Sequence, residues 1–476
     1  MRLAFKSNEL YNRVVSQKGV SSMASTVAAI STPQNTGSIG IIRISGEDAI
    51  TIADRVFEPT GKRRLTELEG YRAAHGFVVY EGERLDECVA LVFRAPKSYT
   101  GENVVELSCH GGLFVLKKVL RAVFSCGAAP AGPGEFTRRA FLNGKLDLTE
   151  AEAVMELINA QNEQGAKASL SALEGALSKK IDALSGRLIS ASAQLSAWVD
   201  YPDDEIEELQ EPVLSKMLCE VESSLSSLLE RFDAGAAVTK GVETAIIGKP
   251  NVGKSALMNL LSGYEKSIVT GIEGTTRDIV EGTVNLGALV LRLADTAGIR
   301  STGDEVEQLG VERAKARLER AGLVFAVFDL SRPLGPEDEE IIALCKGKRV
   351  IAVLNKNDLP TVADEARLKK LFPVHAALCA LDGDGLAQLE EKAERLLCTK
   401  ELDTSQAILS TERQRKNAES ALSAVRRARR TLESGITLDA VNVCIDDAIG
   451  FLLELKGEKA SDAVIDEVFS SFCVGK

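Results

Sequence analysis

The stretch that decides the fold is Gly248-Lys249-Pro250-Asn251-Val252-Gly253-Lys254-Ser255. It has the spacing of a phosphate-binding loop, G-x-x-x-x-G-K-[ST]. The apolar run Val242–Ile247 before it predicts a strand, and residues 256–261 after it predict a helix. Backbone amides in such a loop and the helix N-terminus favour phosphate groups. We therefore expect Lys254 to neutralise the outer phosphates and the Ser255 hydroxyl to bind magnesium.

Two later motifs indicate that the base is guanine. Asn355-Lys356-Asn357-Asp358 follows the predicted strand 350–354, and the Asp358 carboxylate can accept hydrogen bonds from two donors on guanine. Adenine lacks both donors, so an ATP complex would leave a carboxylate unpaired. Cys379-Ala380-Leu381 lies where a backbone amide, expected from Ala380, contacts the guanine oxygen. The sequence therefore predicts a site for GTP as substrate.

The segments that would surround the last phosphate lie between these motifs. Gly274-Thr275-Thr276-Arg277-Asp278 stands where a switch threonine would complete the magnesium shell. Asp295-Thr296-Ala297-Gly298 follows the apolar run 289–294, which places an aspartate at a strand end, near the metal. Ile299 then occupies the place of the water-orienting glutamine of Ras-like enzymes. Hydrolysis must recruit another group or be very slow; the acidic cluster 304–307 is the nearest candidate, although acidic loops are usually only solvated.

The 476-residue chain is long enough for two to four domains. Residues 24–143 alternate short apolar runs with Gly and Pro, which predicts an α+β domain. Residues 147–236 and 410–472 have helical spacing, and the first stretch opens with capping-box spacing at Thr149-Glu150-Ala151-Glu152. Residues 241–399 alternate strands and helices, as in a doubly wound parallel sheet. The predicted domains are 1–143 (with 1–23 a disordered leader, an upstream start or a transit segment), a discontinuous helical domain (144–240 and 400–476), and an inserted Ras-like GTPase domain (241–399).

Composition excludes several classes of protein. The net charge is -12, so a generally basic nucleic-acid coat is excluded, although a local basic patch is not. No apolar run approaches the ~18 residues of a membrane helix, and we expect no membrane contact. The nine cysteines contain no Cys-x-x-Cys pair and the three histidines are far apart. We therefore expect neither a disulfide framework nor a zinc site. We expect the protein to be located in a reducing cytoplasm.

Together these motifs and several others resemble the tRNA-modification GTPase family called MnmE or TrmE, one of the TrmE-Era-EngA-like GTPases. The similarity runs from about Thr26 to Lys476. The first and last segments below set this family apart from other bacterial GTPases. Outside the nucleotide motifs, the resemblance is carried by Ile41-Ile42-Arg43-Ile44-Ser45-Gly46, Ser98-Tyr99-Thr100-Gly101-Glu102, His110-Gly111-Gly112, Pro133-Gly134-Glu135-Phe136-Thr137-Arg138-Arg139-Ala140-Phe141-Leu142-Asn143, Lys145-Leu146-Asp147-Leu148 and Phe472-Cys473-Val474-Gly475-Lys476.

The resemblance implies a potassium-activated GTPase that works with the flavoprotein MnmG (also called GidA). Together they would add an aminomethyl or carboxymethylaminomethyl group to carbon 5 of the wobble uridine of certain tRNAs. The carbon would come from a tetrahydrofolate derivative, formyl or methylene, and FAD would be carried by the partner. The resemblance also implies a homodimer, formed through the N-terminal domain, and a complex of heterotetramer type with MnmG.

The resemblance further implies roles for single residues outside the phosphate loop. Arg43, Glu106, Lys145 and Lys476 would contact the folate, whose anionic tail suits the three cations. Cys473 matches the cysteine of the family's terminal motif and is a candidate catalytic residue; an inert buried thiol is the competing interpretation.

Within the GTPase segment, the resemblance implies two ion sites and a catalytic glutamate. Glu307 would orient the attacking water through a second water. Lys254 would be a further catalytic side chain. Potassium would be held by Asn251, Thr270, Ile272 and Thr275, and magnesium by Ser255 and Thr276. Gly271 and Cys379 depart from the family's usual aspartate and serine. The whole predicted GTP site comprises Asn251, Val252, Gly253, Lys254, Ser255, Ala256, Thr270, Gly271, Ile272, Glu273, Gly274, Thr275, Thr276, Asp295, Thr296, Ala297, Gly298, Asn355, Lys356, Asp358, Cys379, Ala380 and Leu381.

Two alternatives stay open at this point. A ribosome-assembly, RNA-binding GTPase switch of the Era/EngA type shares the nucleotide motifs but does not account for residues 24–147 or the terminal pentapeptide. A folate-dependent enzyme complete in itself would use GTP only as a regulator. Titration with a reduced folate separates the first alternative from our interpretation, and a modification assay with and without the partner separates the second.

Overall fold

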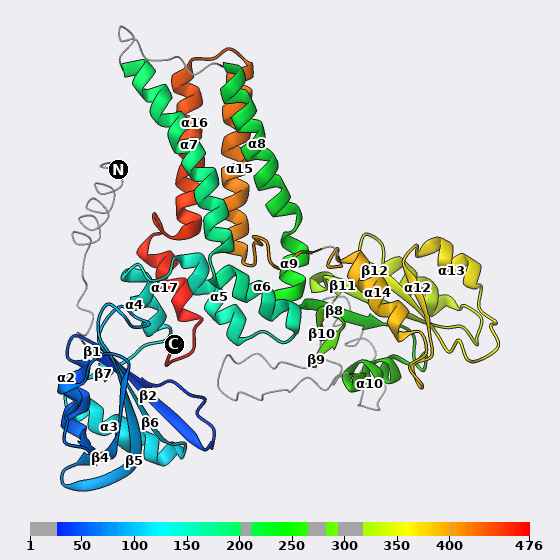
Figure 1. Cartoon of the computed structure of the whole chain (residues 1–476). Helices are drawn as coiled ribbons and strands as arrows, with labels where there is room; N and C mark the ends of the chain where they lie inside the picture. Colours follow the sequence, from blue (N-terminus) through cyan, green and yellow to red (C-terminus); the bar gives the residue numbers. More distant parts are fainter. Residues whose placement is uncertain (1–25, 201–210, 265–281, 294–317, 401) are drawn as a thin grey trace. The chain divides into compact units, whose positions relative to one another are not determined.

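The computed structural model describes residues 26–200, 211–264, 282–293, 318–400 and 402–476, and the statements below refer to these residues (Figure 1). The chain forms two compact units. Unit 1 comprises Met1–Leu146 and Asp462–Lys476, and unit 2 comprises Asp147–Ser461. The terminal residues, which we expect to belong to the helical domain, are grouped with unit 1 by their packing, with the rings of Phe469 and Phe141 6.2 Å apart.

Unit 1 is an α+β domain, as predicted, built on a seven-stranded sheet of order β3-β4-β5-β6-β2-β1-β7. Neighbouring strands are antiparallel except for the parallel pair β1 and β7. The strands are β1 (Thr26–Ile30), β2 (Ile39–Gly46), β3 (Phe57–Pro59), β4 (Arg72–Tyr80), β5 (Glu83–Phe93), β6 (Val104–His110) and β7 (Ala129–Pro130). The helices are α2 (Ala49–Val56), α3 (Leu113–Ser125), α4 (Glu135–Leu142) and α17 (Asp462–Ser470), with a 3-10 turn at Leu65–Glu67.

Strand alternation separates the core of unit 1 from the side chains on the opposite face of its sheet. Ile42 and Ile44 on β2 are fully buried in one apolar cluster with Leu116 and Val119 of α3. Successive side chains of a strand point to opposite faces of the sheet. Arg43, between the two isoleucines, therefore lies on the face away from this core. Its register partner across β2 and β6 is Glu106.

The helical part of unit 2 is discontinuous in sequence, as predicted. Helices α15 and α16, which follow the GTPase segment, share one apolar core with α7 and α8, which precede it. Leu188, Leu225, Val425 and Leu452 are among its buried residues. The helices are α5 (Leu148–Ile158), α6 (Glu163–Leu173), α7 (Ala176–Asp200), α8 (Glu211–Glu230), α9 (Phe232–Thr239), α15 (Glu412–Glu433) and α16 (Leu438–Lys456).

The first of these helices begins two residues earlier than its capping signal suggested. Asp147 is the N-cap of α5, and its carboxylate accepts from the amides of Thr149 (2.9 Å) and Glu150 (3.0 Å). The Glu150 carboxylate accepts in return from the Asp147 amide at 2.9 Å. This reciprocal pair is a capping box over 147–150, whereas we had expected one over 149–152.

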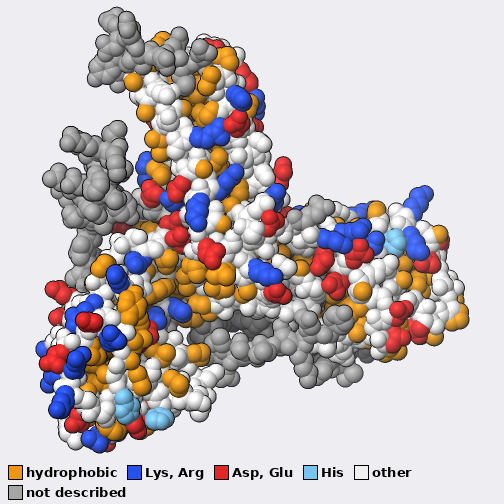
Figure 2. Space-filling view, viewed as in Figure 1, with side chains coloured by type: hydrophobic (Ala, Val, Ile, Leu, Met, Phe, Trp, Pro, Cys, Tyr) orange, Lys and Arg blue, Asp and Glu red, His pale blue; other side chains and the backbone are white. Residues whose placement is uncertain are grey.

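Charged side chains of opposite sign are interspersed along the helical bundle on the face shown in Figure 2. Arg426 and Arg429 of α15 share the Glu222 carboxylate, at 2.9 and 3.0 Å. Arg427 pairs with Asp447 at 2.9 Å. None of the described helices is long and apolar enough to cross a membrane.

The rest of unit 2 is a doubly wound α/β domain, which confirms the predicted fold. Its sheet has the order β13-β12-β11-β8-β10-β9, parallel except for the hairpin β9–β10. Every residue of the central strand β11 is buried, as expected of a parallel strand with helices on both faces. The strands are β8 (Val242–Ile247), β9 (Thr283–Leu286), β10 (Leu289–Leu293), β11 (Leu323–Asp329), β12 (Val350–Asn355) and β13 (His375–Leu378); the helices are α10 (Lys254–Tyr264), α12 (Pro336–Leu344), α13 (Glu365–Leu371) and α14 (Leu386–Leu396).

The helices of this domain lie on opposite faces of its sheet. Leu257 of α10 and Leu389 of α14 pack in one apolar cluster with Phe325 of β11. Ile341 of α12 packs in the other cluster, with Phe328 of the same strand. Ligands of such folds bind at the carboxyl ends of the strands. The phosphate loop and the two guanine motifs all begin at those ends.

Candidate functional site

The phosphate loop connects the end of β8 to the start of α10, as its sequence predicts. Gly253 has a φ of 103°. A Cβ atom at this position would lie 2.2 Å from Nδ2 of Asn355, so only glycine fits. Asn251 also has a left-handed φ of 62°, a conformation that asparagine tolerates better than most residues. The loop is therefore fixed in a turn that larger or β-branched residues would disturb.

Lys254 lies at the mouth of this turn. Its Nζ donates to the carbonyl oxygens of Gly248 (2.6 Å) and Lys249 (2.8 Å). Burial lowers the pKa of Lys254, while the nearby carboxylate of Glu337 acts in the opposite direction. Ser255, the next residue, is exposed at the N-terminus of α10. The cation and the hydroxyl therefore stand together where the dipole of a helix N-terminus favours phosphate.

Asn355 joins the phosphate loop to the second guanine motif. Its side-chain Nδ2 donates to the carbonyl oxygen of Val252 at 2.7 Å, and its Oδ1 accepts from the Ala380 amide at 3.0 Å. Asn355 is buried at the end of β12. One side chain thus holds two loops from different strands in a fixed relation. The Ala380 amide, which we expected to contact the guanine oxygen, has Asn355 as its partner in this structure.

Lys356 makes a second bridge from the same motif. Its Nζ donates to the Asn251 carbonyl at 3.2 Å and forms an ion pair with Asp329 at 2.6 Å. Burial alone would raise the pKa of Asp329, but hydrogen bonds from Lys356 and Ser331 bring it below its usual value. Asp329, at the end of β11, was not identified from the sequence; an aspartate directly after an apolar strand was the available signal.

The base-recognition side of the site is open. Asp358 is exposed after β12, and Leu381 is 86% exposed after the adjacent strand β13. Cys379 and Ala380, between that strand and Leu381, are buried. An exposed carboxylate and an exposed apolar side chain on neighbouring loops suit a planar base with hydrogen-bond donors on its edge.

Several predicted site residues lie outside the described residues, and the structure places none of them. They are Thr270, Gly271, Ile272, Glu273, Gly274, Thr275, Thr276, Asp295, Thr296, Ala297, Gly298 and Glu307.

A separate cluster in unit 1 collects most of the predicted folate residues. The Arg43 guanidinium pairs with the Glu106 carboxylate at 2.8 Å, and these side chains are 16% and 19% exposed. The guanidinium also lies 5.5 Å from the ring centroids of both Tyr99 and Phe136. Such contacts hold a cation against aromatic faces.

The end of the chain completes this cluster. Burial lowers the pKa of Lys476, as does the charge of Arg43, while Glu106 acts oppositely, so the three side chains share one electrostatic environment. The Lys476 carbonyl accepts from the Phe136 amide at 3.0 Å. Lys145 lies beside the turn that carries Tyr99, with its Nζ 3.4 Å from the Pro96 carbonyl oxygen.

The structure places Cys473 in the same tail, partly buried, with its carbonyl accepting from the Gly134 amide at 3.3 Å. Sequence reasoning assigned no role to Tyr99 and Phe136, although both lie in segments that carried the resemblance. It also missed Arg139, which is only 4% exposed and pairs with Glu135 (3.0 Å) and Glu102 (3.1 Å).

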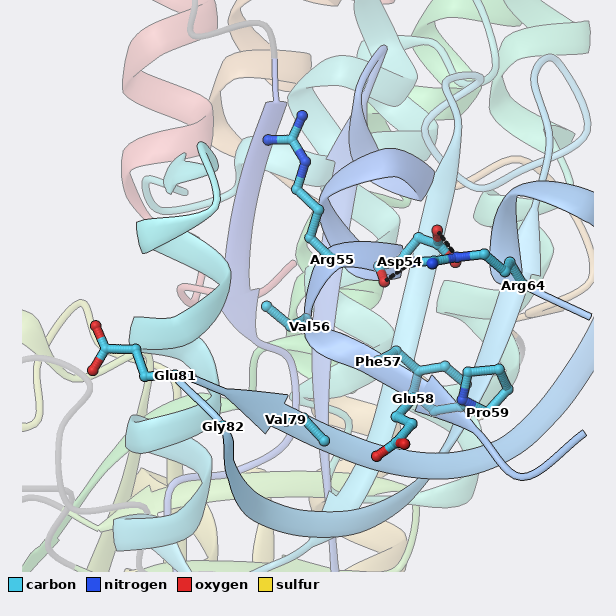
Figure 3. Close-up of a pocket in the computed structure, with 10 residues that line it drawn as sticks. All are labelled: Asp54, Arg55, Val56, Phe57, Glu58, Pro59, Arg64, Val79, Glu81 and Gly82. Atoms are coloured by element: carbon cyan, nitrogen blue, oxygen red, sulfur yellow. Dashed lines mark hydrogen bonds and ion pairs between the residues drawn. The ribbon is translucent and has the colours of Figure 1, made fainter.

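A hollow of about 510 Å³ lies elsewhere in unit 1, beside α2 and β3 (Figure 3). Asp54 pairs there with Arg64 at 2.8 Å, and Arg55 and Glu81 point away from that pair. Arg55 donates to the Cys126 carbonyl at 3.2 Å. Asp54, Arg55 and Arg64 are therefore already paired, and none of the predicted site residues lines the hollow.

The doubly wound domain and its phosphate loop define a P-loop nucleotide-binding protein, joined to a helical domain and an α+β domain. Comparisons with known proteins give its family. Residues 26–145 match the family described as GTP-binding protein TrmE N-terminus, and residues 148–473 match the MnmE helical domain. The chain belongs to the MnmE family of tRNA modification GTPases.

Individual relatives match over nearly the whole chain. The tRNA modification GTPase MnmE of Acetivibrio thermocellus is 39% identical over 456 residues, covering 95% of this chain and 99% of that protein. The MnmE of Lactococcus lactis subsp. lactis is 40% identical over 453 residues, covering 95% and 98%. Among solved structures, an Era variant of Aquifex aeolicus bound to GDP and aluminium fluoride is 30% identical, covering 38% of this chain and 66% of that one, with a TM-score of 0.26.

Proposed function

We propose that this chain hydrolyses GTP at the loop 248–255 in the service of tRNA modification. The observation that carries this proposal is the pair of hydrogen bonds by which Asn355 ties Val252 of the phosphate loop to Ala380 of the guanine motif. Phosphate and base recognition are thereby built into one rigid site. Family membership over nearly the whole chain supports the same activity.

In this proposal, the described residues of the site divide between phosphate, base and magnesium binding. The amides of 251–256 and the Lys254 ammonium hold the phosphates, and the Asp358 carboxylate selects guanine. The exposed Ser255 hydroxyl suits a hard cation such as magnesium, which it would hold together with Thr276. Magnesium, when bound, neutralises charge on the phosphate oxygens. The domain boundaries in this proposal are the predicted ones, except that residues 462–476 are grouped with unit 1.

We propose further that potassium activates hydrolysis. Asn251 is exposed at the tip of the loop, so its side-chain oxygen is available to a monovalent cation. In the resemblance, Thr270, Ile272 and Thr275 would supply the other ligands. A cation there offsets negative charge that develops on the phosphates. Glu307 would orient the attacking water, a task for which Ile299 is chemically unsuited.

The test is GTP turnover in KCl and in NaCl for the full chain, for Glu307→Ala and for the neighbouring control Glu305→Ala. We expect at least tenfold faster turnover in potassium for the wild type and the control, and a loss of two orders of magnitude or more in Glu307→Ala, as on removal of a positioned catalytic group. Equal rates in the two salts would remove potassium from the proposal. Full activity of Glu307→Ala would remove the glutamate.

The cluster around Arg43 supports a role for unit 1 in binding a reduced folate. Arg43, Lys145 and Lys476 are cations suited to the anionic tail of a tetrahydrofolate derivative, and Glu106 is an acceptor suited to pterin amino groups. Calorimetric titration with formyl- or methylene-tetrahydrofolate tests this role. An Era/EngA-type switch would not bind the folate.

We propose finally that the chain acts as a homodimer with the flavoprotein MnmG, which carries FAD, on the wobble uridine of certain tRNAs in the cytoplasm. The family match supports this assignment. A modification assay with substrate tRNA, GTP and folate should yield the aminomethyl or carboxymethylaminomethyl uridine only when MnmG is added. Product formed by this chain alone would overturn the assignment to a two-protein complex.

A further inference from the structure

A buried ion pair connects the phosphate loop to the start of α12. The Lys249 Nζ lies 2.6 Å from Oδ2 of Asp338, and the two side chains are 16% and 1% exposed. The same Oδ2 accepts from the Gly335 amide at 2.8 Å, at the N-terminus of α12. Among the described residues, Oδ1 of Asp338 has no hydrogen-bond partner. Within the described residues, Lys249 is therefore the only ion-pair partner of the Asp338 carboxylate.

The phosphate loop contains a second lysine very close to this pair. Lys254 Nζ donates to the carbonyl oxygen of Lys249 itself, at 2.8 Å. The charge of Glu337, the residue before Asp338, already acts on Lys254. The first turn of α12 thus presents negative charge to the cation that must face the phosphates.

A buried carboxylate without a cation is unstable, and it will take a proton or attract another positive group. If Lys249 were neutral, the lysine available to Asp338 inside the loop would be Lys254. The same carboxylate also fixes the first turn of α12, so its displacement would move that turn against the loop. Both effects reach the phosphate-binding groups without any contact between Lys249 and a nucleotide.

We propose that Lys249 and Asp338 are positioning residues of the phosphate loop: Lys249 neutralises the buried Asp338 carboxylate and thereby leaves Lys254 free to face the β-phosphate of the nucleotide. This inference rests on the proposed binding of GTP at the same loop. It goes beyond that function because the loop motif G-x-x-x-x-G-K-[ST] leaves the residue at position 249 unspecified.

The inference predicts a selective loss of affinity. GDP carries a β-phosphate for Lys254 and the loop amides, whereas GMP carries only the α-phosphate. A badly positioned loop should therefore weaken GDP binding and leave GMP binding, which relies on base recognition, nearly unchanged. A variant that merely folds poorly would weaken both nucleotides equally.

The experiment measures GDP and GMP affinities of the full chain by competition against a fluorescent GDP analogue. The variants are Lys249→Met, which keeps the stem of the side chain without its charge, Lys249→Arg, Asp338→Asn and the double variant Lys249→Met/Asp338→Asn. We expect GDP affinity to fall at least about tenfold in Lys249→Met, as for loss of a charged hydrogen bond, and GMP affinity to change less than twofold. Asp338→Asn should lose less GDP affinity than Lys249→Met, because it leaves no carboxylate that could draw Lys254 away from the phosphates. Lys249→Arg should stay within threefold of the wild type.

The double variant supplies the decisive comparison. Because Asp338→Asn removes the carboxylate that would compete for Lys254, the double variant should bind GDP more tightly than Lys249→Met. Unchanged GDP affinity in Lys249→Met, equal losses for GDP and GMP, or a double variant that binds GDP no better than Lys249→Met would overturn the inference. If Asp338→Asn fails to fold, the Lys249→Met and Lys249→Arg comparison alone decides. Failure of the wild-type chain to prefer GDP over ADP would instead overturn the proposed function, and this inference with it.

Discussion

Arg43 and Glu106 face each other across strands β2 and β6, and their side chains form an ion pair at 2.8 Å. The pair lies on the sheet face opposite the apolar core, where Lys476 shares its electrostatic environment. We expect Glu106→Gln to weaken binding of a reduced folate by about 10–100-fold, since a charged acceptor for the pterin amino groups is lost. Calorimetric titration measures this change.

The matched control for that experiment is Glu87→Gln. Glu87 is an exposed glutamate of the same sheet and pairs with His75 at 2.8 Å. Its replacement should leave folate affinity unchanged. Wild-type affinity in Glu106→Gln, or an equal loss in both variants, would contradict the placement of the folate at this pair.

The tail that carries Lys476 is held by a close backbone approach. Gly475 has a φ of 101°, and a Cβ atom there would lie 2.3 Å from the carbonyl oxygen of Ile30. Gly475→Ala should therefore displace Lys476 and reduce folate affinity at least about tenfold, because overlap with backbone cannot relax by a rotamer change. Gly82→Ala, at a similar φ of 79° but with nothing within 4 Å, is the control for backbone strain alone. Equal affinities of the two variants would show that the tail does not contribute.

A comparable test uses one glycine of the phosphate loop and one glycine of the helix that follows it. Gly253→Ala places a methyl group against Asn355, whereas Gly263 on α10 has nothing within 4 Å. We expect Gly253→Ala to lower GDP affinity by more than about 100-fold through combined strain and overlap. Gly263→Ala should keep the GDP affinity of the wild type. GDP binding at wild-type strength by Gly253→Ala would contradict the observed closeness of the loop to Asn355.

Stability should depend on pH through Glu156 of α5. Burial raises the pKa of Glu156 to about 7, against the opposing effects of Ser410 and Lys240, and the charge of Glu152 raises it further. In the unfolded chain, the pKa of a glutamate is near 4.3. The folded state therefore binds the proton more tightly, and this contribution is complete below pH 4 and lost as pH rises through 7.

The free energy of unfolding of Glu156→Gln, measured relative to wild type, should be about 2–3 kcal/mol higher at pH 8 than at pH 5. The reason is that the wild type loses the contribution of the protonated Glu156 over this range. Denaturant unfolding at the two pH values measures this difference. Glu230→Gln, an exposed glutamate of α8, should show no such gain. A gain that is equal at both pH values would contradict the raised pKa as its cause.

The sequence predicted those features that depend on short, continuous patterns. The strand at 242–247 matches β8, and the phosphate loop lies where its glycines require. The spacing of Asn355 from the loop gives no indication that its side chain would reach Val252, since that contact joins two strands separated by β11. The aromatic partners of Arg43 come likewise from distant segments, and only the folded sheet brings them together.

The end of the chain shows a different limit. Residues 462–470 have helical spacing, and helical spacing alone does not tell which core a helix joins. The decisive features are Gly134 and Gly475, whose positive φ values and close backbone neighbours appear only in the folded chain. The resemblance grouped Lys476 with Arg43 and Glu106, and in the structure the charges of Arg43 and Glu106 act on Lys476.

If the loop 248–255 and Asp358 together form a site for guanine nucleotides, Asp358→Asn should change which base the site prefers. In xanthine a carbonyl replaces the 2-amino group of guanine, so an amide at position 358 can donate where the carboxylate accepted. Hydrolysis of GTP and XTP by the full chain should show a preference for GTP of about 100-fold or more in the wild type and for XTP in the variant. An unchanged preference for GTP in Asp358→Asn would contradict the account.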